Sequence, residues 1–95
     1  MNIRDLKPGM RSVNIKVTVS EISEPKQVIT GKGVEYEILE AKVEDETGAM
    51  TLVLWDEKIL LLKVGDVLQI ENGFVTSFKG DWRINVGKYG EIAKI

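Results

Sequence analysis

The chain has 95 residues, a formal net charge of −2, and neither histidine nor cysteine. This length suits one domain spanning residues 1–95, and the two absent residue types exclude a thiol nucleophile, an imidazole base and a Cys/His zinc site. No apolar run approaches the ~20 residues of a membrane span and no signal-peptide core is present, so we expect a cytoplasmic protein. The acids Asp56-Glu57 and Glu44 to Glu46 fit a helix start and a turn rather than a catalytic pocket, so we expect neither an enzyme nor a cofactor.

Residues 13–20 carry the alternation of a half-buried strand, with valine or isoleucine at every second position. After a break at Pro25 and a turn at Gly31-Lys32-Gly33, strand character resumes over residues 34–44. The apolar positions of this segment change parity at Ile38-Leu39. That change predicts a β-bulge of the kind that bends strands around a barrel.

A hairpin turn at Asp45-Glu46-Thr47-Gly48 leads into a third strand that ends at Trp55. The consecutive acids Glu44 to Glu46 are expected to form a solvated turn rather than a metal site. Asp56 predicts the N-cap of a short helix that runs through Leu62 and has one apolar side.

The last third of the chain predicts two more strands and an edge. Residues 67–78 form the fourth strand, Lys79-Gly80-Asp81 closes a hairpin, residues 82–86 return as the fifth strand, and residues 91–95 add a final edge. Regular short strands with one short helix between the third and fourth predict an all-β fold, the five-stranded OB-fold Greek-key barrel.

Trp55 falls on the side of its strand opposite the predicted core. Met50, Leu52 and Leu54 alternate on one face, so Trp55 points away from them. An outward indole needs a cover, which is either a stacked ligand or a contact with a subunit or with the N-terminal arm.

Phe74 and Phe78 have the same parity as Leu68 and Ile70, which would place both rings inside the barrel. Gly73 stands where a bulge would reverse the phase of the strand and turn the two rings outward. From these residues alone both orientations stay open.

The returning strand carries a second tryptophan. Trp82 is in phase with Ile84, which favours barrel packing or a capping role over ligand contact. Arg83 and Asn85 take the opposite parity and should face whatever Trp55 faces. Tyr36 lies next to the expected bulge, so the sequence does not assign it to a face.

Several runs of residues, in their order and spacing along the whole chain, resemble the simple archaeal single-stranded DNA-binding proteins that consist of one OB-fold. The runs are Leu6-Lys7-Pro8-Gly9-Met10, Asp45-Glu46-Thr47-Gly48, Leu54-Trp55-Asp56, Ile70-Glu71-Asn72-Gly73-Phe74 and Phe78-Lys79-Gly80. The pattern is also similar to the B subunit of the eukaryotic sensor-of-single-stranded-DNA complex and, more distantly, to the OB domains of replication protein A.

The resemblance implies sequence-independent binding and protection of single-stranded DNA in replication, recombination and repair, by a protein associated with a prokaryotic nucleoid. It implies that Trp55, Phe74 and Phe78 stack on bases. It also places Lys26 and Val28 in the loop that touches the DNA strand.

Two further expectations come from the resemblance. Asn85 is a nucleic-acid-binding position where the eukaryotic relatives have another aromatic residue, so this chain lacks a ring there. Family members usually continue into a flexible tail that recruits partners, so replication or repair proteins are expected to bind through a tail absent from this chain.

A single-stranded DNA binder also needs cations to neutralise phosphates. The candidates are Lys16, Lys26, Lys79 and Arg83, with Lys88 as a further one. Two alternatives stay open: an OB-fold subunit that binds a protein partner through its exposed rings, and an RNA-binding OB-fold.

Overall fold

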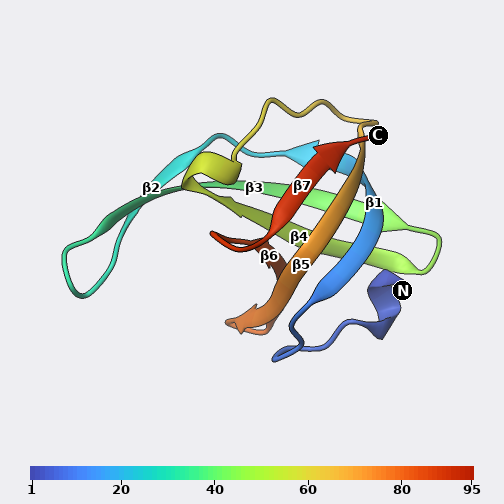
Figure 1. Ribbon diagram of the computed structural model, residues 1–95, viewed down its shortest axis with the longest axis horizontal. Helices are drawn as coiled ribbons and strands as arrows, with labels where there is room; N and C mark the ends of the chain where they lie inside the picture. The colour runs from blue at the N-terminus through green and yellow to red at the C-terminus, as the bar shows by residue number, and fades with distance from the viewer.

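The computed structural model describes all residues, 1–95, and contains a closed five-stranded barrel (Figure 1). Its strands are β1 (Val13–Ile22), β3 (Glu35–Asp45), β4 (Gly48–Trp55), β5 (Val67–Phe78) and β6 (Asp81–Val86). They pair in the order β1-β3-β4-β6-β5, and β5 pairs back with β1 to close the sheet. Only β4 and β6 run parallel. The OB-fold barrel predicted from the sequence is confirmed.

Four short elements accompany the five barrel strands, and two of them extend the same sheet. They are the 3-10 turns η1 (Ile3–Asp5) and η2 (Asp56–Lys58), and the strands β2 (Lys26–Ile29) and β7 (Glu91–Lys94). β7 pairs with the first half of β5 and confirms the predicted edge. β2 pairs with the start of β3, and Figure 1 shows this β2–β3 hairpin extending away from the barrel. No helix has the length and apolar character needed to cross a bilayer.

The helix predicted between the third and fourth barrel strands is reduced to the single turn η2. Asp56 does not act as its N-cap. This residue has a φ of 46°, and its Oδ1 accepts a hydrogen bond of 2.9 Å from the Glu37 amide on β3. Beyond η2 the chain continues without a helix, and Leu62 is buried in the core. Tertiary contacts therefore override the local helix signal.

The bulge predicted at Ile38-Leu39 is wrong. β3 pairs with β4 residue for residue, from Ile38 opposite Trp55 to Asp45 opposite Gly48. Leu39 faces the core, whereas Ile38 is buried on the outer side of the sheet beside Trp55. Two consecutive apolar residues are needed because both faces of β3 are covered at this point.

A bulge does interrupt β5. Val13 pairs with Gly73 but Ile15 pairs with Ile70, so β5 holds one more residue than β1 over this stretch. Asn72 takes a φ of 54° there. Ile70 and Val75 are both buried despite their opposite parity, which confirms that the phase of the strand reverses near Gly73.

Side-chain hydrogen bonds and close packing fix this bulge. The Asn72 amide donates to Asn14 Oδ1 at 2.9 Å, and Asn72 Nδ2 donates to the Tyr89 carbonyl at 3.0 Å. A Cβ at Gly73 would lie 3.2 Å from both the Asn85 carbonyl oxygen and Ile70 Cγ2. Glycine at this position thus lets β5 and β6 pack closely.

The N-terminal arm closes one end of the barrel, where Ile3 and Leu6 are buried. The Asp45 carboxylate holds the arm: it accepts from the Ile3 amide at 2.8 Å and from the Thr47 amide and hydroxyl at 2.7 and 2.6 Å. Burial raises the pKa of Asp45, but these hydrogen bonds outweigh it and keep the pKa below the ordinary value of 3.8. Within the acidic turn, Asp45 therefore anchors the arm.

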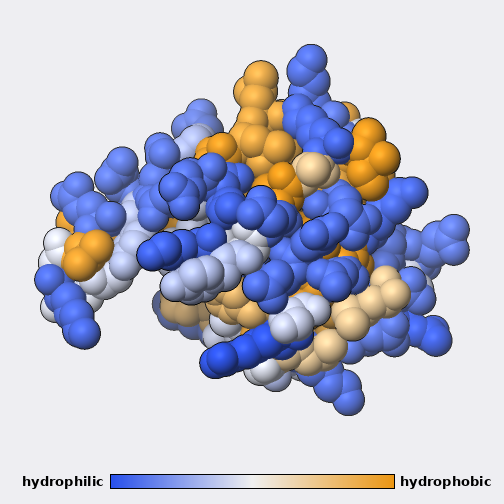
Figure 2. All heavy atoms as spheres, in the orientation of Figure 1, coloured by the Kyte–Doolittle hydropathy of each residue, from blue (hydrophilic) through white to orange (hydrophobic).

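Most of the surface in the view of Figure 2 is hydrophilic. Hydrophobic side chains gather over the segment that joins η2 to β5, where Leu61 and Val64 are exposed. This segment is tied down by Asp66, which accepts from the Lys63 amide at 2.8 Å and pairs with Lys94 of β7 at 3.4 Å.

Gly73→Ala should lower the free energy of unfolding by about 1–3 kcal/mol, because the new methyl group crowds the β5–β6 packing. Urea denaturation measures this loss. Gly31→Ala is the matched control, since nothing lies within 4 Å of a Cβ there, and it should leave stability nearly unchanged. Equal stability of the two variants would contradict the packing argument.

Asp45→Ala should lower the free energy of unfolding at pH 7 by about 1–2 kcal/mol, because charge-assisted hydrogen bonds to the arm are lost. The folded-state pKa is depressed, so this stabilisation is complete above about pH 4 and disappears as the pH falls through the lowered pKa. Denaturation of both proteins at pH 7 and at about pH 2 should show the difference shrinking at low pH. Glu46→Ala, which removes an exposed neighbouring acid, should show no such trend.

Candidate nucleic-acid interface

The outer face of β3, β4, β6 and the second half of β5 carries four aromatic rings, which we call the ring surface. They belong to Tyr36, Trp55, Phe74 and Phe78. Trp55 is half-buried on the face opposite the core, as predicted, while Phe74 and Phe78 are 37% and 56% exposed. The outward orientation of both phenyl rings follows from the bulge at Asn72.

Asn85 lies beneath these rings and joins three of the surrounding groups. Its Oδ1 accepts from Trp55 Nε1 at 3.3 Å. Its Nδ2 donates to Thr76 Oγ1 at 2.9 Å and to the Phe74 carbonyl at 3.3 Å. The side chain is only 4% exposed, so Asn85 orients the ring surface from below and offers little area to a ligand.

The Tyr36 ring also packs against Trp55. The two rings meet edge to face, with centroids 5.6 Å apart and planes at 85°. Lys26 and Val28, expected in a loop, lie instead on strand β2. Val28 pairs with Tyr36 and Lys26 pairs with Ile38, so both residues share the face of Trp55. The structure therefore brings Lys26 and Val28 to the ring surface.

Phe78 carries two cations at the other end of the surface. Lys79 Nζ lies 5.4 Å from the centroid of the ring and Arg83 Cζ lies 5.3 Å from it. Lys79 and Gly80 have φ values of 51° and 81°, which is the geometry of a tight two-residue hairpin turn. The turn thus fixes Lys79 next to Phe78.

Two acids partly neutralise these cations. Glu40 pairs with Lys26 at 3.4 Å and with Arg83 at 3.6 Å, so one carboxylate links the two ends of the ring surface. Asp81 pairs with Arg83 Nε at 3.3 Å. The surface is therefore close to electrically balanced rather than strongly basic.

A hollow of about 450 Å³ separates Trp55 from Phe74. The rest of its wall is formed by Tyr36, Asp56, Glu57, Gly87 and Lys88. The Phe74 ring lies directly over Gly87, where a Cβ would come within 3.3 Å of Phe74 Cε1. The hollow is lined by flat rings and open to solvent on one side, which is the form of a site for a planar group.

Two residues considered from the sequence lie elsewhere. Lys16 projects from β1 beside the acidic turn and shares a hollow with Glu44 and Glu46, away from the ring surface. This position separates Lys16 from the other predicted cations Lys26, Lys79 and Arg83. Trp82 is 46% exposed and lines a groove with Ile3 and Leu6, which fits the capping role.

Sequence reasoning missed Tyr36 and Glu40 as parts of this surface. Both share the parity of Ile38 on β3, and Ile38 pairs with Trp55. An uninterrupted alternation through β3 would have placed them correctly. The structure contains no group of three or more acidic, histidine or cysteine side chains placed to hold a metal ion.

A closed five-stranded barrel with a surface of aromatic rings and cations defines a class of nucleic-acid-binding OB-folds. The family model "Single-stranded DNA binding protein Ssb-like, OB fold" matches residues 6–94, and the chain belongs to this family.

Single-stranded DNA binding protein Ssb of Saccharolobus solfataricus is 45% identical over 92 residues. The match covers 97% of this chain and 62% of that relative, so the chain spans less than two thirds of the relative's length.

Among solved structures, the second OB-fold domain of replication protein A from Methanococcus maripaludis is similar with a TM-score of 0.83 at 24% identity, over 100% of this chain and 93% of that one. An OB domain from Thermoplasma acidophilum has a TM-score of 0.84 at 22% identity, covering 100% and 85% of the two chains. At these identities the two structures establish the shared fold.

Asn85→Leu should release the Trp55 indole while keeping the side-chain volume similar, because the acceptor of the indole N–H is lost. Hydrogen exchange of the two indole N–H groups, followed by NMR, tests this. The Trp55 signal should exchange faster than in the parent protein, and the Trp82 signal serves as an internal control that should not change. Unchanged exchange at Trp55 would show that Asn85 does not hold the indole.

Proposed function

We propose that this protein binds single-stranded DNA without sequence preference by stacking bases on Trp55, Phe74 and Phe78. The observation that carries the proposal is the presence of these three rings on one open face of the barrel, supported from below by Asn85. Every base has a π-face, so such a surface accepts any sequence. The protein acts as a binder and needs no catalytic group for this role.

The spacing of the rings suits separate bases. Phe74 and Phe78 are four residues apart on one strand, which corresponds to about 13 Å. Each stacked base contributes about 1–3 kcal/mol, so three rings supply several kcal/mol before the cost of ordering a flexible strand is subtracted. Stacking alone is thus large enough to account for useful affinity.

Charge plays the smaller part in the proposed binding. Lys26, Lys79 and Arg83 stand at the edges of the ring surface, where they can meet phosphates. Glu40 and Asp81 already compensate Lys26 and Arg83, and the whole chain has a net charge of −2. A strand bound here gains little from counterion release compared with a strongly basic protein.

The family and the Ssb relative support single-stranded DNA as the ligand. Protection of exposed strands during replication, recombination and repair is the cellular role we propose, in the cytoplasm at the nucleoid. Preference for RNA on the same rings would be recognised as a different outcome of the binding experiment below, and a protein partner is favoured if no oligonucleotide binds.

Trp55→Ala should weaken the binding of oligothymidylate by about tenfold or more, since one stacked base is lost. Titrations of a labelled oligonucleotide, with circular dichroism to verify the fold, measure the effect. Trp82→Ala is the matched control, because it removes an indole outside the ring surface and should leave the affinity unchanged.

The same experiment distinguishes the ligand classes. Indole emission of a Trp82→Phe variant reports Trp55 alone and should be quenched by oligothymidylate, whereas duplex DNA of equal length should bind much more weakly. Preferential binding of a matched RNA oligomer would redirect the proposal to RNA. Equal affinities of Trp55→Ala and the parent protein would remove Trp55 from the site.

A further inference from the structure

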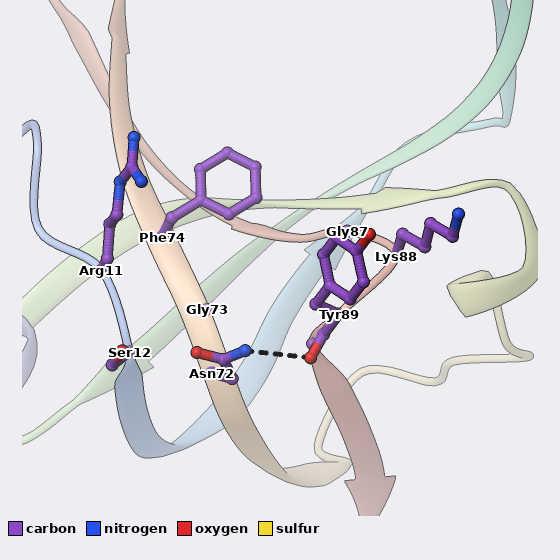
Figure 3. A pocket seen from close by; sticks show the side chains of 9 residues that line it. Arg11, Ser12, Asn72, Gly73, Phe74, Gly87, Lys88 and Tyr89 are labelled. Atoms are coloured by element: carbon purple, nitrogen blue, oxygen red, sulfur yellow. Dashed lines mark hydrogen bonds between the residues drawn. The ribbon is translucent and has the colours of Figure 1, made fainter.

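A second hollow, of about 490 Å³, lies on the other side of Phe74 from Trp55. Figure 3 shows the Arg11 and Phe74 side chains along one side of it and the Tyr89 ring, with Gly87 and Lys88, on the other. Phe74, Gly87 and Lys88 line both hollows, so the second one continues directly from the ring surface.

The chemistry of this hollow differs from that of its neighbour. Its charged residues are Arg11 and Lys88, and no acid lines it, whereas Asp56 and Glu57 line the hollow beside Trp55. Neither Arg11 nor Lys88 takes part in an ion pair. The hollow therefore has uncompensated positive charge, which is the complement of a phosphate.

Tyr89 adds an exposed aromatic ring to this hollow. The residue is 80% exposed, and Lys88 Nζ lies 5.7 Å from the centroid of its ring. A tyrosine this exposed contributes almost nothing to the core, yet it presents a flat face beside one cation, with Arg11 on the other side of the hollow. A ring with a neighbouring cation is also found at Phe78, where Lys79 and Arg83 lie close to the ring.

The backbone that carries Tyr89 is held in place. The Tyr89 carbonyl accepts the hydrogen bond from Asn72 Nδ2, as drawn in Figure 3, and the Gly90 amide donates to the Gly87 carbonyl at 3.0 Å. A Cβ at Gly90 would lie 3.0 Å from Val86 Cγ1, so this turn packs against the barrel. The ring is thus presented by a fixed turn, which reduces the entropy lost on binding.

We infer that this second hollow is a fourth nucleotide subsite, in which a base stacks on Tyr89 while Arg11 and Lys88 meet the phosphate that links it to the nucleotide on Phe74. The inference rests on the proposed function, because the occupant is the next nucleotide of the same single strand. It adds one stacked base and one or two phosphate contacts to the site.

The test compares Tyr89→Ala and Arg11→Ala with the parent protein, using labelled oligothymidylates from about 4 to 16 nucleotides, the range of OB-fold site sizes. Tyr89→Ala should weaken the longer oligomers about tenfold and leave the shortest ones nearly unaffected. Arg11→Ala should also make the slope of log affinity against log salt shallower by about 0.7. Both residues are exposed, so both variants should fold.

Two variants control the experiment. Tyr89→Phe keeps the ring and should bind as the parent does, which separates stacking from hydrogen bonding by the hydroxyl. Lys16→Ala removes one positive charge from the other side of the barrel and should leave the salt slope unchanged.

The outcomes separate the inference from the proposed function. If the parent binds oligothymidylate with quenching of Trp55 but Tyr89→Ala and Arg11→Ala match it at every length, the fourth subsite is refuted and the three-ring site stands. If the parent binds no oligonucleotide at any length, both proposals fail together.

Discussion

The bulge at Asn72 is the constraint on which the surface of this barrel depends. Before the bulge, even-numbered residues of β5 such as Ile70 face the core. After it, odd-numbered residues face the core, beginning with Gly73 and Val75. A regular strand would bury Phe74 and Phe78 and expose Val75, since a shift of one residue exchanges the two faces. Asparagine tolerates the positive φ that the bulge requires. The Asn72 side chain also fixes the turn before β7 by donating to the Tyr89 carbonyl.

Asn85 applies a second constraint, by a different physical principle. A buried amide is costly unless its donors and acceptor are satisfied, and here Trp55, Thr76 and the Phe74 carbonyl satisfy them. Because these partners come from β4 and β5, on either side of the strand β6 that carries Asn85, the amide holds the three strands in one relative position. A phenyl ring in place of Asn85 would give up this support, because it can neither accept from the Trp55 indole nor donate to Thr76.

The sequence predicted the barrel and the outward side of Trp55 because strand alternation is a local signal that the barrel preserves. It also identified Gly73 as the position of a phase change, although the residues alone left the orientation of the phenyl rings open. The helix through Leu62 failed because the Asp56 carboxylate bonds to β3 instead of capping. The alternation of β1 correctly placed Lys16 on the outside of the barrel. Alternation separates inside from outside, but it does not say where around the barrel an outward residue lies.

The expectation of a bulge at Ile38-Leu39 failed for a related reason. Strand patterns are interpreted as one buried and one exposed face, but Trp55 and Tyr36 cover the outer face of β3 enough to bury Ile38 as well. Part of this cover, Trp55, comes from the neighbouring strand β4 and is distant from Ile38 in sequence. The ring surface was therefore hard to predict from the sequence. Its rings cover Ile38 and allow an apolar residue there, and this residue interrupts the alternation of β3.

The balance of charge on the ring surface bears on its selectivity. A duplex offers phosphates but no free base faces, so a protein that binds duplex DNA must gain its affinity from uncompensated cations. Here Glu40 compensates Lys26 and Arg83 on the ring surface, and Asp81 compensates Arg83 again. The proposed mode of binding thus gains most from the contact that only an unpaired strand can make. In such a design a net negative charge weakens the binding of both single strands and duplexes, but stacking offsets this cost only for unpaired bases, so the charge favours single strands over the duplex.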